Sequence, residues 1–245
     1  MDSTTKKLYT ALGVIFIFLV WYISSIIIDN EIILPKIDAV FKALIKILGE
    51  KKTYLIIFST LLRLLITIAI SFIIGLSLGI LSIKFSKVYA FLSPNIAMFR
   101  SIPVVSIIII LLIIFGSNLA PIIITSLVVL PIIYEGVYTS FKSIDKSLID
   151  DITTISDVNI KVIKDVYMPM TKPYIISSLV TSFGFGFKVM VMSEFISQPN
   201  NSMGKVILYN REMLNMDVVF AWTLIIIFLV ILFESILKKV KQTGE

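Results

Sequence analysis

The chain has 245 residues, of which 58% are apolar and 16% are charged, and its mean hydropathy is +1.01. A bilayer core about 30 Å thick takes about 20 apolar residues for each helical crossing, so this composition supplies about six crossings and leaves little for a water-soluble core. The composition therefore excludes a two-domain cytosolic enzyme.

Two missing residue types narrow the function further. With 0 Cys the chain has no disulfide, thiolate nucleophile or cysteine metal site, and with 0 His it has no imidazole base or ligand. We therefore expect no catalytic, cofactor-binding or metal-binding residues. We attribute the formal charge of +6 to basic residues that hold cytoplasmic loops in place, and not to nucleic-acid binding.

Long apolar runs predict an all-α, polytopic membrane protein with about six transmembrane helices in a single domain, 1–245. The first run lacks a cleavage pattern of small residues, so we expect it to be retained as a helix. The third is interrupted at Pro94 and Pro103, which neighbouring helices can tolerate. The predicted spans are 11–28, 56–83, 90–115, 119–138, 174–192 and 218–237.

Basic residues indicate the orientation. If the N-terminus is cytoplasmic, the loops on its side hold an excess of Lys and Arg, so we expect both termini inside the cell. After the first span, Leu34-Pro35 opens an amphipathic stretch that should lie on the membrane surface. Its apolar residues at helical spacing are Ile37, Val40, Phe41, Leu44, Ile45 and Leu48.

The segment between the fourth and fifth spans, 143–168, predicts two short amphipathic helices beneath the membrane. Asp150 and Asp151 lie on the polar face of the first helix. The second helix should end at Pro169 and Pro173. The apolar face of the first helix comprises Ile144, Leu148, Ile149, Ile152 and Ile155.

This segment is similar to the cytoplasmic signature of binding-protein-dependent ABC importer permeases. That signature has an acidic residue and two small residues, then a Gly, and further on a Leu-Pro pair. Here the match runs from Asp150-Asp151-Ile152, through Ser156 in place of the Gly, to Met168-Pro169. The Glu-Ala-Ala core of the family signature is degenerate in this chain.

Further motifs fit the same family, and within it the nitrate, sulfonate and taurine branch. The resemblance covers about residues 30 to 240 in the right order. The matching motifs are Leu34-Pro35 with the amphipathic stretch after it, Thr60-Leu61-Leu62-Arg63, Arg100-Ser101-Ile102-Pro103, Ser143-Ile144-Asp145, Ser193-Glu194-Phe195, Met203-Gly204 and Asp217-Val218-Val219-Phe220-Ala221.

The resemblance implies a type I permease fold in the cell membrane and import of a small solute such as a sulfonate, nitrate or similar small anion. Related permeases also carry pyrimidine precursors of thiamine. The implied partners are an ABC ATPase subunit, an extracytoplasmic solute-binding lipoprotein and a second copy of the chain. The chain itself would hydrolyse no ATP, since its Gly204-Lys205 pair lacks the rest of a phosphate-binding loop.

In this family, short cytoplasmic helices are coupling helices that dock on the ATPase and transmit its movement to the membrane helices. The resemblance therefore implies an ATPase-coupling role for the first helix of the segment 143–168. A carboxylate pair with catalytic or metal-binding function and a merely solvated helix face are the alternatives. The implied coupling residues are Asp150, Asp151, Ile152, Ile155 and Ser156.

Polar residues of the fifth span are candidates for a translocation path. Lys188 and Glu194 are costly in lipid and should face protein or a water-filled path, although a structural ion pair or snorkelling to the interface is equally open. Ser178, Ser182 and Gly186 recur every fourth residue, a stripe that either permits close helix approach or lines a polar conduit.

Two features of the second span indicate helix packing. We expect Arg63 to hold helices together and not to bind substrate, and we assign the Gly-x-x-x-Gly motif at Gly75 and Gly79 to close helix contact. The main alternative function is a self-contained secondary carrier driven by an ion gradient. Such carriers usually show inverted repeats or carboxylates near the membrane midplane, and Glu194 lies too near the end of a span to fit well.

Overall fold

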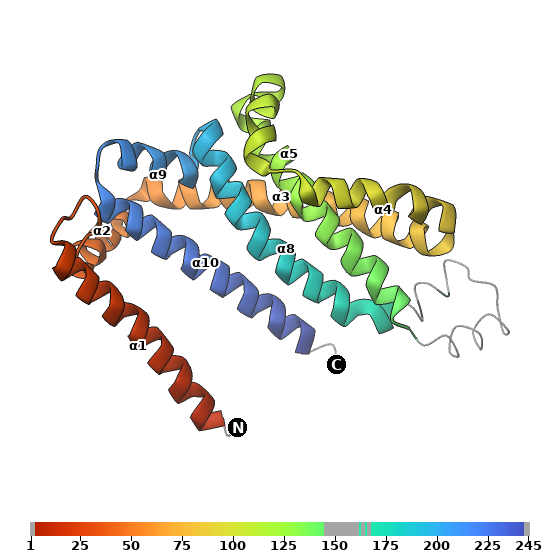
Figure 1. Ribbon diagram of the computed structural model, residues 1–245, viewed down its shortest axis with the longest axis horizontal. Coiled ribbons are helices and arrows are strands. Elements are labelled where there is room, and N and C mark those ends of the chain that lie inside the picture. Colours follow the sequence, from red (N-terminus) through yellow and green to blue (C-terminus); the bar gives the residue numbers. More distant parts are fainter. Residues whose placement is uncertain (1–2, 145–161, 163–164, 166–167, 243–245) are drawn as a thin grey trace. The chain divides into compact units, whose positions relative to one another are not determined.

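A computed structural model describes residues 3–144, 162, 165 and 168–242, and every regular element within these ranges is helical. This confirms the predicted all-α fold. The helices are α1 (Ser3–Ile28), α2 (Ile37–Gly49), α3 (Lys51–Lys84), α4 (Ser86–Ser101), α5 (Val104–Lys142), α8 (Met168–Ser197), α9 (Met203–Glu212) and α10 (Met216–Gln242) (Figure 1).

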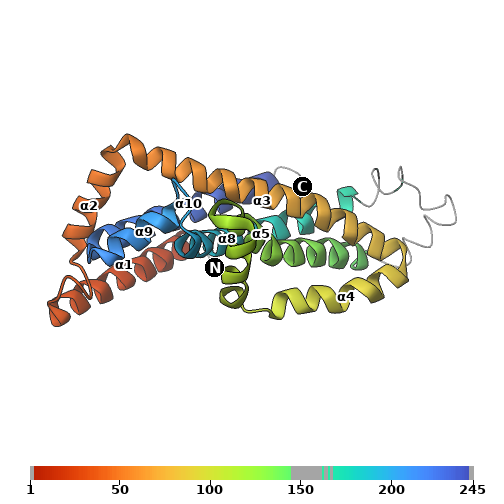
Figure 2. The same cartoon turned by 90° about the horizontal axis from the view of Figure 1, so that it is seen from above.

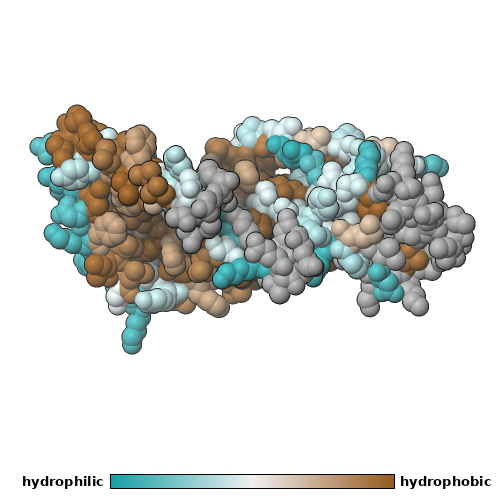
Figure 3. Space-filling view, turned by 90° about the horizontal axis from the view of Figure 1, so that it is seen from below, coloured by the Kyte–Doolittle hydropathy of each residue, from teal (hydrophilic) through white to brown (hydrophobic). Residues whose placement is uncertain are grey.

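Five helices in the described part of the chain are long and apolar enough to cross a membrane, namely α1, α3, α5, α8 and α10. Large apolar side chains stay exposed along them, among them Ile27 at 77% and Ile113 at 80%. Figure 3 shows apolar side chains, in brown, over much of one face. Exposed apolar surface of this extent is unusual for a soluble monomer and fits contact with lipid or with other membrane helices.

The predicted third span, 90–115, is not a single helix. α4 ends at Ser101, Ile102 and Pro103 have extended backbone, and α5 begins at Val104. Pro103 explains the break, because a proline disfavours helical backbone at the residue before it and has no amide hydrogen to donate. Pro103 is instead well suited to the position just before the first turn of α5.

α5 includes the predicted boundary between the third and fourth spans, and a break in the helix lies at that boundary. Gly116 interrupts it with φ 72° and ψ 174°, a backbone conformation that residues with a Cβ rarely adopt. α5 therefore consists of two helical segments joined by a kink at Gly116, and Figure 1 shows the change of direction.

α8 begins earlier than the predicted fifth span. Pro169 and Pro173 lie in its first turns, and Pro169 costs little there because the first amides of a helix have no partner within the helix. Most of the helix that was predicted to end at these prolines lies outside the described residues. The sequence analysis predicts no helix at α9. Most of the predicted coupling segment, 143–168, lies outside the described residues, and so do Asp150 and Asp151.

The described residues form two compact units. The first comprises Met1–Ile56 and Val206–Ile227, and the second comprises Ile57–Lys205 and Phe228–Glu245. In the first unit the indole Nε1 of Trp21 donates a hydrogen bond to the carbonyl of Pro35 (3.1 Å), and its ring packs against Phe220 with centroids 5.6 Å apart. α2 is the amphipathic helix that the sequence predicts at this position, and it buries one face through Val40, Ala43 and Ile47.

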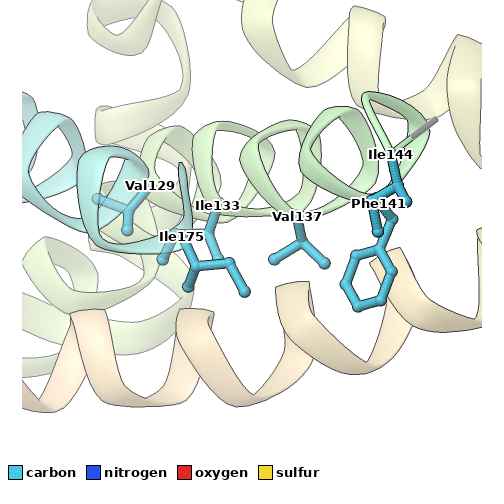
Figure 4. Packing of buried hydrophobic residues seen from close by; sticks show 6 residues of the cluster. All are labelled: Val129, Ile133, Val137, Phe141, Ile144 and Ile175. Carbon is cyan, nitrogen blue, oxygen red and sulfur yellow. The ribbon is translucent and has the colours of Figure 1, made fainter. Parts of the chain in front are cut away.

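The core of the second unit lies between α3, α5 and α8. Side chains of α5 point toward α3, and Ile175 of α8 joins them (Figure 4). α5 and α8 lie side by side (Figure 1), and α4 lies beside α5 (Figure 2). The buried residues of this cluster are Val129, Ile133, Val137, Phe141, Ile144 and Ile175, and Ile68, Phe72, Leu76 and Ile80 of α3 pack against them.

Small residues allow these helices to approach closely. A Cβ added at Gly75 would lie 2.9 Å from Cγ2 of Ile133, and one added at Gly79 would lie 2.6 Å from Cγ1 of Val137. The predicted role of this Gly-x-x-x-Gly motif in helix packing is therefore confirmed. Between α5 and α8, a Cβ at Gly136 would lie 2.3 Å from Cβ of Ser178.

Gly136→Ala should destabilise the protein by about 2 kcal/mol, which lowers the melting temperature by roughly 4–8 °C for a chain of this size. The added methyl group meets a Cβ that cannot rotate away, so the second change Ser178→Gly should recover most of the loss. Thermal unfolding in detergent measures both variants. Gly13→Ala is the control, because a Cβ there has no neighbour within 4 Å; a stable Gly136→Ala variant would contradict the close contact.

Candidate functional site

Two Arg and Glu pairs lie in the described part of the second unit. At the first, the carboxylate of Glu194 near the end of α8 is completely buried, with 0% of the residue exposed. It accepts hydrogen bonds from Oγ1 of Thr60 (2.9 Å), from Nη1 of Arg63 (2.9 Å) and from the backbone amide of Gly204 (3.4 Å). We call Thr60, Arg63, Glu194 and Gly204 the Glu194 cluster. Its cation and its donors compensate the loss of water around a buried charge.

Arg63 extends this cluster into the loop after α8. Its guanidinium donates hydrogen bonds to the carbonyl oxygens of Asn200 (2.8 Å) and Asn201 (3.4 Å). Gly204 is needed for the close approach of α9, since a Cβ there would lie 2.2 Å from the backbone nitrogen of Phe195. The cluster thus fastens α3, the end of α8 and the start of α9 to one another.

The predicted role of Arg63 as a contact that holds helices together is confirmed. For Glu194 the sequence analysis leaves two interpretations open, and the structure places this residue in the ion pair with Arg63. Lys188 lies apart from that pair. It is exposed on α8, and its Nζ is 5.7 Å from the centre of the Phe185 ring.

The stripe of small residues lies on the buried face of α8. The hydroxyl of Ser178 donates to the carbonyl of Ile175 (2.8 Å), and the buried hydroxyl of Ser182 has no hydrogen-bond partner among the described residues. A Cβ at Gly186 would lie 2.8 Å from Cγ2 of Val129. This face therefore makes close helix contact. The predicted coupling residues Asp150, Asp151, Ile152, Ile155 and Ser156 lie outside the described residues.

The second pair lies in an open groove of about 690 Å³ between α4, α5 and α8. Arg100, in the last turn of α4, donates a hydrogen bond from Nη1 to Oε1 of Glu135 on α5. The break at Pro103 lets α4 lie beside α5 (Figure 2), which brings together two residues that are 35 positions apart. Other lining residues with hydroxyl groups are Thr139, Tyr174, Ser177, Ser178 and Thr181, and the apolar ones include Phe99, Ile102, Val104, Ile132, Phe185 and Val189.

The groove has the composition of a solute-binding site, with mostly apolar walls and a few polar groups. Of the predicted path residues, Ser178 lies in its lining, whereas Ser182, Gly186, Lys188 and Glu194 are not among the described residues that line it. The sequence analysis missed Glu135. The signal was present, because a carboxylate inside the predicted span 119–138 is costly in lipid and marks a functional position.

Comparisons with known proteins agree with this architecture. A family described as the inner membrane component of binding-protein-dependent transport systems matches residues 71–242. The chain belongs to this family. It is thus an ABC importer permease subunit and a multi-pass membrane protein, and the match includes α4, α5, α8 and therefore the groove.

The individual proteins that the chain resembles share a quarter or less of its residues. A protein of Methanocaldococcus jannaschii, provisionally named as an ABC transporter permease, is 25% identical to this permease over 213 residues, which cover 84% of this chain and 79% of the relative. Two crystal forms of the MetNI methionine ABC transporter in inward facing conformations match with TM-scores of 0.70 and 0.68, at 19% identity, and cover 80% of this chain and 99% of the other. This likeness shows the fold.

Removal of Arg63 should destabilise the permease strongly. Arg63→Ala leaves the carboxylate of Glu194 buried without its cation, which costs about 3–5 kcal/mol. The double variant Arg63→Ala/Glu194→Gln should recover part of the loss, because a neutral amide requires no cation. Thermal unfolding in detergent measures both, with Lys188→Gln, an exposed position on the helix that also holds Glu194, as the control. Equal melting temperatures for Arg63→Ala and the control would contradict the role of the Glu194 cluster.

Proposed function

We propose that this permease moves a small solute, of the sulfonate, nitrate or similar small-anion class, from an extracytoplasmic binding protein into the cell. The observation that carries the proposal is the family match over residues 71–242 together with the groove between α4, α5 and α8. The guanidinium of Arg100 in that groove is a suitable group for an anionic oxygen. The resemblance of the motifs to the nitrate, sulfonate and taurine branch supports the same solute class.

The energy for transport comes from a partner ATPase in this proposal. The Gly204-Lys205 pair supports this, since the amide of Gly204 binds Glu194 and the residue is buried in helix contact, so the pair is no phosphate-binding loop. The segment 143–168 docks on the ATPase and transmits a rigid-body movement to α5 and α8, which flank it in the chain.

Two copies of the permease form the working unit in this proposal. A closed two-fold arrangement would place the path at the shared interface, and the apolar surface left exposed along the helices offers area for such contact. The assembly lies in the cell membrane, with both termini on the cytoplasmic side because basic residues are in excess there. Ser178 in the groove and Lys188 on the exposed face of α8 are proposed to line the path.

Reconstitution tests the function directly. The permease is placed in vesicles with its partner ATPase and binding lipoprotein, and uptake of the solute that the lipoprotein binds is measured. We expect uptake that requires ATP and both partners. Uptake by the permease alone, driven by an ion gradient, would instead support a self-contained secondary carrier.

Charge reversal of the coupling helix should separate docking from membrane insertion. Asp150→Lys/Asp151→Lys is expected to abolish co-purification with the ATPase and to reduce ATP-driven uptake at least tenfold, because the acidic face no longer fits its partner. The variant should still be recovered from the membrane fraction. Asp38→Lys on α2 is the matched control and should keep the ATPase bound. Unchanged co-purification of the double variant would argue against the docking role.

A further inference from the structure

Three tyrosine rings lie nearly parallel near the start of α4 and the end of α5. Tyr89 of α4 is stacked on Tyr138 of α5, with ring centroids 4.4 Å apart and planes that differ by 10°. Tyr134, one turn before Tyr138, is stacked with it in turn, with centroids 6.2 Å apart and planes that differ by 6°. We call Tyr89, Tyr134 and Tyr138 the tyrosine clamp.

We propose that the tyrosine clamp makes α4 and the end of α5 move as one body during transport, with Tyr89 and Tyr138 as positioning residues. The inference rests on the proposed function, because it names the side chains that pass a movement of the segment 143–168 from α5 on to α4. Arg100 lies in the last turn of α4, so the clamp also positions this wall of the groove between α4, α5 and α8.

α4 has little else to hold it in place. The backbone is extended at Phe85 and at Ile102-Pro103, so breaks join α4 to α3 and to α5 where a continuous helix would fix its direction. Among the residues of α4, all of which are described, Ile96 alone is buried. The direction of α4 therefore depends on the few side chains that contact its neighbours.

Side-chain contacts at two points hold α4 against α5. The ion pair of Arg100 and Glu135 is one of them, but its side chains are 55% and 40% exposed, and exposed ion pairs contribute little because water and salt compete for the charges. The stacked rings of Tyr89 and Tyr138 form the other, and salt does not screen a contact between neutral rings. The tyrosine clamp is therefore the firmer contact, and the ion pair adds a second point that limits rotation of α4.

Tyr134 connects the clamp to α3. Its side chain is buried, and its hydroxyl donates a hydrogen bond to Oγ of Ser82 on α3 (3.0 Å). Tyrosines that only anchor a helix at the membrane surface present their rings to the lipid headgroups. The clamp tyrosines are instead buried or half-buried against protein, whereas Tyr174 at the start of α8 is 56% exposed. The clamp thus joins three helices.

The clamp lies where a movement of the segment 143–168 first reaches α5. Tyr138 is one turn before Lys142, the last residue of α5, which places it about 6 Å from that end along the helix axis. The breaks at Pro103 and Gly116 separate the first part of α5 from α4 and from the rest of α5. α4 and the part of α5 after Gly116 can therefore turn together as a rigid segment.

The ratio of solute uptake to ATP hydrolysis in the reconstituted importer tests the proposal. Tyr89→Leu removes the stacked ring but keeps apolar bulk, and it should lower this ratio about fivefold, the population change expected for the loss of one stacked aromatic pair. Tyr89→Phe keeps the ring and should keep the ratio. The control is Phe91→Leu at a position of α4 that is 71% exposed. An unchanged ratio in Tyr89→Leu would overturn the proposal, because a mere loss of folded importer lowers uptake and hydrolysis together.

A cross-link that replaces the clamp gives a second test. The chain has 0 Cys, so Tyr89→Cys/Tyr138→Cys carries the only two thiols of the permease, and a short bifunctional thiol reagent can join them. Without the reagent this variant lacks the stacked rings and should couple as poorly as Tyr89→Leu. The cross-link should restore the ratio of the unchanged importer. A cross-link that leaves the ratio low, or that stops uptake because α4 has to separate from α5, would contradict the proposal.

A measurement on the permease alone distinguishes this inference from the proposed function. Spin labels on Lys87→Cys and Thr139→Cys, at exposed positions of α4 and α5, should give a narrow distribution of distances that Tyr89→Leu broadens. Equal widths in the two proteins would exclude the clamp even if the importer works. Absence of ATP-driven uptake in the unchanged importer would overturn the proposed function, while the distance distributions still decide whether the tyrosines hold α4 on α5.

Discussion

Close contact between α3, α5 and α8 is the constraint on which the rest of the second unit depends. Helices in lipid gain little from burying apolar surface against each other, so their association relies on van der Waals contact and on a few polar bonds. Gly75 and Gly79 let α3 approach α5, and Gly136 does the same between α5 and α8 opposite Ser178. This packing sets the positions of α5 and α8, and hence the shape of the groove and the depth at which Glu194 is buried.

This permease contains two Arg and Glu pairs whose burial differs, and the difference in burial gives the same ion pair a different role in each place. The pair of Arg63 and Glu194 is enclosed, and backbone groups of the loop after α8 and of α9 complete its hydrogen bonds, so opening it would leave a buried charge uncompensated. The pair of Arg100 and Glu135 lies at the wall of an open groove, where solvent and solutes can compete for each partner. The enclosed pair is suited to holding helices together permanently, and the exposed pair is suited to reversible binding.

The groove between α4, α5 and α8 depends on breaks in the helices as well as on the helices themselves. Pro103 ends α4 and turns the chain so that α4 lies beside α5, and Gly116 bends α5 with a backbone conformation that favours glycine. A continuous helix over 90–115 would carry Arg100 away from Glu135 in space. Transport requires elements with more than one arrangement, and helices divided at such points can move as separate rigid segments.

The sequence by itself determined the helical class, most of the long apolar helices, the amphipathic helix α2 and the family, because hydropathy, helical spacing and short motifs are local properties of the chain. It also indicated that Arg63 and the glycines of α3 hold helices together. The tertiary structure decided three further features. It paired Arg63 with Glu194, which is 131 positions away, it placed Arg100 and Glu135 in one groove, and it started α8 earlier than the hydropathy pattern indicates. In a transmembrane helix that is apolar on every side, the hydropathy pattern does not indicate which face contacts which neighbouring helix. The rotation of each helix about its axis and its register against its neighbours therefore follow from packing alone.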